Sequence, residues 1–143
     1  MTHKLETLMG FDFGTKRIGV AVGQTITKTA RALTTVKTKK DGVPWDEIKQ
    51  LIKKWQPDAL VVGIPLNMDG TEQPLTQLAK QFSVELTIHF HLPVYGIDER
   101  LSTKEARGKL FEEGGFKALQ DGQVDSIAAQ LILQNWLTTH TTE

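Results

Sequence analysis

Asp12 is an acidic residue inside an otherwise apolar segment, flanked on both sides by phenylalanine. Burying a carboxylate in such a segment is costly unless a partner stabilises its charge. Strand alternation places Gly10 and Asp12 on the same face, and Gly10 leaves space beside the acid. This arrangement favours a metal ion or a substrate that approaches the sheet. The alternative is an aspartate that stabilises the following Gly14-Thr15 turn by accepting its hydrogen bonds.

Two further acids lie where a functional site is expected. Glu99 closes a short predicted strand, at the end where α/β folds bind ligands, and alternation points Asp98 and Glu99 to opposite faces. Asp125 lies near the start of the last predicted helix. Taken singly, Glu99 could mark a solvated strand end, with Arg100 paired to a neighbouring acid, and the helix dipole could explain Asp125. Together with Asp12, these acids offer the hard oxygen ligands that Mg²⁺ or Mn²⁺ requires for phosphodiester cleavage.

The hydrophobic pattern predicts the elements that position these acids. Strands are expected over 8–13, 18–22 and 30–36, with 14–17 as a hairpin turn between the first two. The continuous apolar run 59–64 is typical of a strand buried on both faces, and 94–98 reads as another short strand. Helical spacing and start signals predict helices from Pro44, from Pro74, over 102–113 and over 123–137.

This order predicts an α/β fold with a mixed five-stranded sheet. Three strands form an antiparallel meander, and parallel strands joined by right-handed crossovers follow, with helices flanking the sheet. A chain of 143 residues fits one domain over 1–143, with the threonine-rich segment 138–143 as a frayed tail.

The composition limits the classes of function. The 17 basic and 17 acidic residues cancel, so any role with nucleic acid must depend on a local patch. The absence of cysteine excludes disulfides, thiolate metal ligands and cysteine nucleophiles. No apolar stretch is long enough to span a membrane, and the N-terminus lacks the apolar core of a signal peptide, so we expect a cytoplasmic protein without a membrane partner.

Four ordered blocks of the sequence resemble the YqgF family. The first block is DFGTKRIGVA at 12–21, and GIPLNMDGT follows at 63–71. The others are DERLST at 98–103 and DSIAA at 125–129, so the resemblance covers about 8–136. Members of this family are described as Holliday junction resolvases and as nucleases of pre-16S ribosomal RNA. Four blocks in the same order are far more specific than any one of them.

The resemblance implies a ribonuclease H-like fold and a metal site at Asp12, Glu99 and Asp125. It favours an endonuclease, dependent on Mg²⁺ or Mn²⁺, that matures the 5′ end of pre-16S ribosomal RNA. Resolution of branched DNA is the alternative within the family, and the enzyme could be a monomer or a homodimer. Ala128 stands where resolvases of this fold carry a fourth acid, so the resemblance leaves open whether one or two metal ions bind.

Two other classes of function remain open. A non-catalytic nucleic-acid-binding factor could keep the same fold, although retained acids favour chemistry because acids repel phosphate without a cation between them. The Asp-x-Gly hairpin at 12–14 also resembles the phosphate loop of ATP-binding actin and sugar-kinase relatives. Those proteins bind nucleotide between two such domains, and this chain supplies only one.

Polar residues near the acids are candidates for contact with the substrate. Basic and hydroxyl side chains in the first hairpin turn could bind phosphate or stabilise the transition state, although ordinary turns are also polar. The loop after strand 59–64 could cover the substrate. The candidates are Thr15, Lys16, Arg17, Asn67 and Arg100. The only local basic cluster in the sequence, Lys37, Lys39 and Lys40, is interpreted as a solvated loop.

Overall fold

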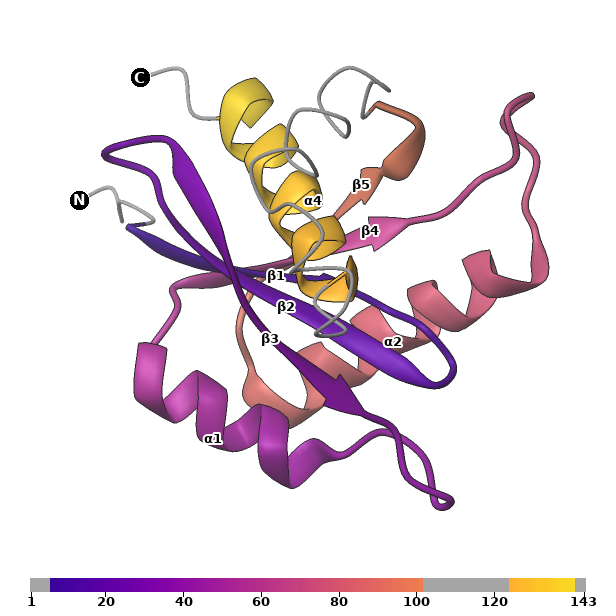
Figure 1. Cartoon of the computed structure of the whole chain (residues 1–143), viewed down its shortest axis with the longest axis horizontal. Coiled ribbons are helices and arrows are strands. Elements are labelled where there is room, and N and C mark those ends of the chain that lie inside the picture. Colours follow the sequence, from indigo (N-terminus) through magenta and orange to yellow (C-terminus); the bar gives the residue numbers. More distant parts are fainter. Residues whose placement is uncertain (1–5, 102–123, 141–143) are drawn as a thin grey trace.

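Five strands form one mixed sheet in the order β3-β2-β1-β4-β5 (Figure 1). The computed structural model describes residues 6–101 and 124–140. The strands β1 (Thr7–Asp12), β2 (Arg17–Gln24) and β3 (Thr29–Lys37) form an antiparallel meander. β4 (Ala59–Ile64) pairs parallel with β1, and β5 (Val94–Asp98) pairs parallel with β4. The predicted mixed five-stranded sheet is confirmed, although β2 and β3 extend beyond their predicted ends at both sides.

Helices cover both faces of the sheet. α1 (Trp45–Trp55) and α2 (Pro74–Phe90) lie against one face, and α4 (Val124–His140) crosses the other (Figure 1). The short 3₁₀ helix η1 (Glu99–Leu101) follows β5. The helix predicted over 102–113, with its capping serine and its terminating glycines, lies outside the described residues.

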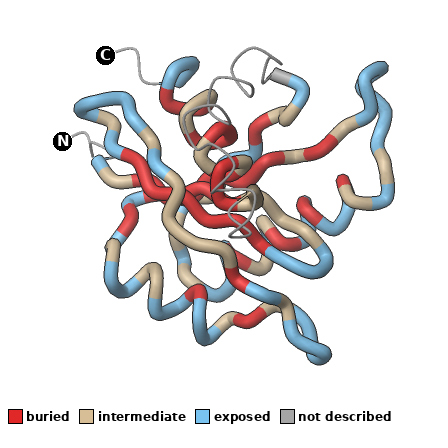
Figure 2. Tube along the Cα trace, in the orientation of Figure 1, coloured by how far each residue is buried: buried red, intermediate tan, exposed pale blue. Residues whose placement is uncertain are grey.

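Two apolar clusters separate along β1 because alternate side chains point to opposite faces. Leu8 belongs to the cluster under α4, whereas Met9 and Phe11 belong to the cluster under α1 and α2. All three side chains are fully buried, and Figure 2 shows the buried residues concentrated along the central strands. Each such side chain stabilises the fold by about 1.5–3 kcal/mol relative to an exposed position. Asp12 therefore lies on the α4 face, as alternation predicts.

The expected space beside Gly10 is filled by α4. A Cβ added to Gly10 would lie 2.9 Å from the Cβ of Leu133 and 3.3 Å from the carbonyl oxygen of Ala129. The prediction of an opening for a metal ion or substrate at Gly10 is thus wrong. The glycine instead allows a helix to pack closely on the sheet, since no side chain separates the two backbones.

The last helix continues past its predicted end. Thr138 to His140, which the sequence assigns to a frayed tail, form the final turn of α4. The Thr139 hydroxyl donates to the carbonyl of Asn135 at 2.9 Å, and the His140 ring stacks on Trp136 with centroids 4.8 Å apart. These contacts hold the last turn in place. None of the helices in the described ranges is long and apolar enough to cross a membrane.

Candidate active site

Asp12 is the last residue of β1 and lies half-buried on the α4 face. Its partner across the antiparallel ladder is Gly19 of β2. On the other side, Phe11 pairs with Val62 of the parallel strand β4, so Gly63 is the next residue beside Asp12. The carboxylate thus stands between two glycines on neighbouring strands. Neither neighbour has a side chain that would cover it.

The first turn of α4 sits directly on Gly19. A Cβ added to Gly19 would lie 1.8 Å from the carbonyl oxygen of Asp125, a distance that no real structure permits. The missing side chain therefore lets Asp125 approach the strand position opposite Asp12. Arg17, at the start of β2, binds the same residue, with its Nε 3.1 Å from Asp125 Oδ2.

Glu99 reaches the same edge of the sheet from η1. A Cβ added to Gly63 would lie 2.6 Å from Glu99 Oε1 and 2.5 Å from Ile132 Cδ1 of α4. The carboxylate of Glu99 therefore lies over Gly63, on the α4 face and next to the position of Asp12. Asp98 turns the opposite way, as alternation predicts for this pair.

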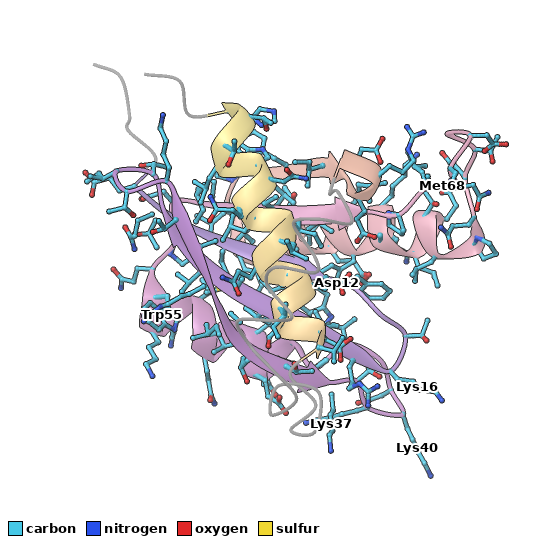
Figure 3. All side chains as sticks on the ribbon, turned by 45° about the horizontal axis from the view of Figure 1, so that its top comes forward. Asp12, Lys16, Lys37, Lys40, Trp55 and Met68 are labelled. Atoms are coloured by element: carbon cyan, nitrogen blue, oxygen red, sulfur yellow. The ribbon has the colours of Figure 1, made fainter. Side chains whose placement is uncertain are left out.

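The three acids share one edge of the sheet without forming a tight ligand cluster. Figure 3 shows Asp12 beside α4, and the two glycines let Glu99 lie over β4 and Asp125 over β2, the strands that flank β1. Within residues 6–101 and 124–140, no group of three or more acids or histidines could hold a metal ion as arranged. The arrangement differs from a metal site in that one oxygen of Asp125 accepts a hydrogen bond from Arg17.

Arg100 and Asn67 stabilise the β4–α2 loop. The Arg100 guanidinium donates to both oxygens of Asp98, with Nη2 2.7 Å from Oδ2, and its Nη1 donates to the carbonyl of Met68 at 3.2 Å. These hydrogen bonds lower the pKa of Asp98 and raise the pKa of Arg100. Asn67 Nδ2 donates to the Thr71 hydroxyl at 3.0 Å. The side chains of both candidates are thus engaged with the protein itself.

Thr15 and Lys16 lie exposed in the β1–β2 turn. The Thr38 hydroxyl donates to the carbonyls of Thr15 and Lys16 at 2.8 and 3.1 Å, and the Thr38 backbone N–H donates to the Lys16 carbonyl at 3.1 Å. The turn is therefore fastened to the segment that follows β3. Arg17 is also exposed, with 57% of its side chain accessible.

Sequence reasoning missed the two glycines that position the acids. Gly19 and Gly63 lie inside predicted strands, where glycine has no side chain to pack and often marks the close approach of another backbone or a ligand. That signal was present in the sequence, but the segments that approach the glycines come from distant parts of the chain.

Known proteins share both the sequence and the fold. The model of the RuvX family, described as "Holliday junction resolvase", matches residues 6–139. A relative from Haemophilus ducreyi, named "Putative pre-16S rRNA nuclease", is 56% identical over 131 residues, which cover 91% of this chain and 94% of the relative. A relative of the same name from Glaesserella parasuis is 58% identical over 132 residues, covering 92% and 95%.

Solved resolvases have the same fold at low sequence identity. Thermus thermophilus RuvC bound to a Holliday junction substrate superimposes with a TM-score of 0.56 at 18% identity, covering 94% of this chain and 97% of that one. Fowlpox virus resolvase bound to a Holliday junction gives 0.56 at 11% identity, covering 93% and 97%. These structures confirm the ribonuclease H-like fold, and the match along the sequence confirms the family: the chain belongs to the RuvX family.

Proposed function

We propose that this protein is a metal-dependent endonuclease that cleaves RNA in the 5′-end maturation of pre-16S ribosomal RNA, in the cytoplasm. The names of its relatives at 56–58% identity support the substrate. The observation that carries the chemistry is the placement of Asp12, Glu99 and Asp125 at one edge of the sheet by Gly19 and Gly63. Three carboxylates from separate elements at one edge of the sheet are better explained by the binding of a cation than by a contribution to the stability of the fold.

The donor set fits Mg²⁺ or Mn²⁺, which prefer carboxylate oxygens. Asp12, Glu99 and Asp125 would hold the ion, and Asp125 would exchange its contact with Arg17 for the metal. That exchange is inexpensive, because an exposed ion pair contributes only about 0.2–1 kcal/mol. A bound ion of this kind lowers the pKa of a water and neutralises charge that develops on the phosphate oxygens.

The protein's own cations would hold the phosphate. Within the described residues Arg17 makes a single ion pair, through Nε, so its Nη nitrogens can donate to a phosphate oxygen. Thr15 and Lys16 precede Arg17 in the turn that Thr38 holds in place, and they would contact the adjoining sugar-phosphate backbone of the substrate. For Asn67 and Arg100, whose hydrogen bonds stabilise the β4–α2 loop, contact with the substrate would require part of their present hydrogen bonding to be exchanged.

Resolution of branched DNA is the second candidate. The description of the matching family favours it, since the model that covers residues 6–139 is described as "Holliday junction resolvase". A resolvase would cut two strands related by symmetry and would therefore act as a homodimer. An enzyme that trims RNA could act as a monomer.

The decisive experiment compares both substrates with one inactive variant. Labelled pre-16S RNA and a synthetic four-way DNA junction are incubated with the protein in Mg²⁺, in Mn²⁺ and in chelator. We expect RNA cleavage that requires the metal and is lost in Asp12→Asn, which has nearly the same shape but loses the charge that would hold the ion. Far-ultraviolet circular dichroism checks that the variant is folded.

The outcome also separates the two candidates. Metal-dependent cleavage of the junction but not of the RNA would replace the proposed substrate. Cleavage that persists in Asp12→Asn would contradict the assignment of the three acids as the catalytic site. If neither substrate is cleaved, a non-catalytic nucleic-acid-binding factor becomes the favoured function.

A further inference from the structure

Four basic side chains gather at one end of the sheet, and we define Lys16, Arg17, Lys37 and Lys40 as the basic strip. Arg17 and Lys37 are direct partners in the β2–β3 ladder. The hydrogen bonds from Thr38 to Thr15 and Lys16 hold the turn against the segment that carries Lys40. Figure 3 shows Lys16, Lys37 and Lys40 at the same end of the molecule. The interpretation of Lys37, Lys39 and Lys40 as a solvated loop agrees with their exposure, but Lys37 is the last residue of β3 and lies opposite Arg17.

The two strand residues of the strip, Arg17 and Lys37, lie on the face that carries the acids. Ile18 and Val36, the next pair along the ladder, belong to the apolar cluster under α1 and α2. Alternation therefore places Arg17 and Lys37 on the opposite face, under the N-terminal end of α4. The ion pair between Arg17 and Asp125 agrees with this placement. Arg17 thus links the basic strip to the carboxylate of Asp125.

The three lysines of the strip carry positive charge that no ion pair among the described residues balances. Like charges placed directly opposite each other in a ladder are destabilising. Among the described residues, Lys16, Lys37 and Lys40 form no ion pair, and Lys39 approaches Glu47 only at 3.9 Å. The whole chain has a net charge of zero, so this is a local concentration and not a property of the composition. A polyanion is the partner that would compensate it.

We propose that the basic strip binds the backbone phosphates of the nucleic-acid strand next to the scissile bond. This inference rests on the proposed nuclease function. Phosphates that enter the site meet three carboxylates, and cations along the approach would offset that repulsion. Because phosphates carry no sequence information, the strip would position the strand without reading its bases.

The test measures how RNA binding depends on salt. A labelled RNA spanning the 5′ end of 16S is titrated with the protein in chelator, at several salt concentrations, so that binding is separate from cleavage. For Lys37→Gln/Lys40→Gln we expect roughly tenfold weaker binding at low salt and a slope of log K against log salt that is shallower by about 1.5. The matched control is Lys49→Gln/Lys53→Gln, which removes two exposed charges from α1 on the other face.

The outcomes distinguish the strip from the proposed function. If the protein binds through the strip but cleaves no RNA, the strip stands and the nuclease proposal fails. If it cleaves RNA while the strip variant keeps the slope, the affinity and the KM of the unaltered protein, the strip is overturned. Equal losses in the strip variant and in the α1 control, or no salt-dependent binding at all, would overturn it as well. Urea unfolding checks folding, and removal of Lys37 should not lower the midpoint because it relieves a like-charge pair.

Discussion

The position of the Glu99 carboxylate depends on Gly63, which has no Cβ atom. Its Oε1 lies only 2.6 Å from the place where Gly63 would carry a Cβ, and Ile132 Cδ1 lies 2.5 Å from the same point. The Glu99 carboxylate therefore occupies space that a side chain at residue 63 would take. A single methyl group at residue 63 tests whether this placement matters for activity.

Gly63→Ala should reduce cleavage much more than it reduces stability. The Ile132 side chain can move, at a cost of about 1–3 kcal/mol for overpacking. Displacement of Glu99 by an ångström would reduce the rate on the order of 10²-fold. Gly96→Ala on β5 is the control, because its nearest contact would be Ile64 Cγ1 at 3.1 Å, on the other face. Single-turnover cleavage and urea unfolding are compared, and equal rates in the two variants would contradict the role of Gly63.

At the scale of elements, α4 reaches the sheet through a row of glycines on the strands beneath it. Gly10, Gly19, Gly23 and Gly63 would all carry their Cβ into atoms of α4 or Glu99. The contacts to α4 differ in kind, because Gly19 faces the backbone of Asp125 whereas Gly23 faces the methyl groups of Leu133 and Leu137, together with the carbonyl of Thr29 on β3. The start of the helix thus approaches the sheet more closely than its later turns do.

Gly19→Ala should be the most damaging of these glycine substitutions. Its Cβ would lie 1.8 Å from a backbone oxygen, so the first turn of α4 must move and carry Asp125 with it. We expect a loss of at least about 3 kcal/mol of unfolding free energy, at the upper end for overpacking, together with loss of cleavage. Gly23→Ala, with its nearest contacts at 3.0 Å, should lose less. Urea unfolding of both variants is the measurement, and a reversed order would contradict the closer approach of α4 at Gly19.

The sequence predicted the elements well and their mutual approach poorly. Period-2 alternation placed Asp12 on the right face of β1, and the continuous apolar run 59–64 identified β4. These signals are local, so one segment is enough to read them. The close packing of Asp125 on Gly19 and the pairing of Lys37 with Arg17 depend on contacts between segments that are distant in the sequence. The spacing of apolar residues within one segment cannot encode such contacts. For this reason the prediction of an open space at Gly10, where α4 packs, was wrong.

At the scale of the whole molecule, the stability of the fold depends on pH through acidic groups in the β4–α2 loop and at the end of β5. The Thr71 hydroxyl and N–H lower the pKa of Asp69, Lys80 lowers the pKa of Glu72, and Arg100 lowers the pKa of Asp98. All three pKa values are lower in the folded state, so the unfolded chain binds protons first as the pH falls. The resulting stability is complete above the ordinary carboxyl pKa values and is lost in acid.

Asp98→Asn should therefore destabilise the protein at pH 6 and have a smaller effect at pH 3. At pH 6 the charged carboxylate receives hydrogen bonds from the Arg100 guanidinium and backbone, and the amide cannot replace that charge. As the pH falls through the folded pKa of Asp98, the unaltered protein loses the same interaction and the two unfolding curves should converge. Urea unfolding at both pH values measures this difference. Asp41→Asn is the control, an exposed acid that forms no ion pair with the described residues. A difference between Asp98→Asn and the unaltered protein that is as large at pH 3 as at pH 6 would mean that packing, and not the charge of Asp98, holds Arg100 and the loop in place.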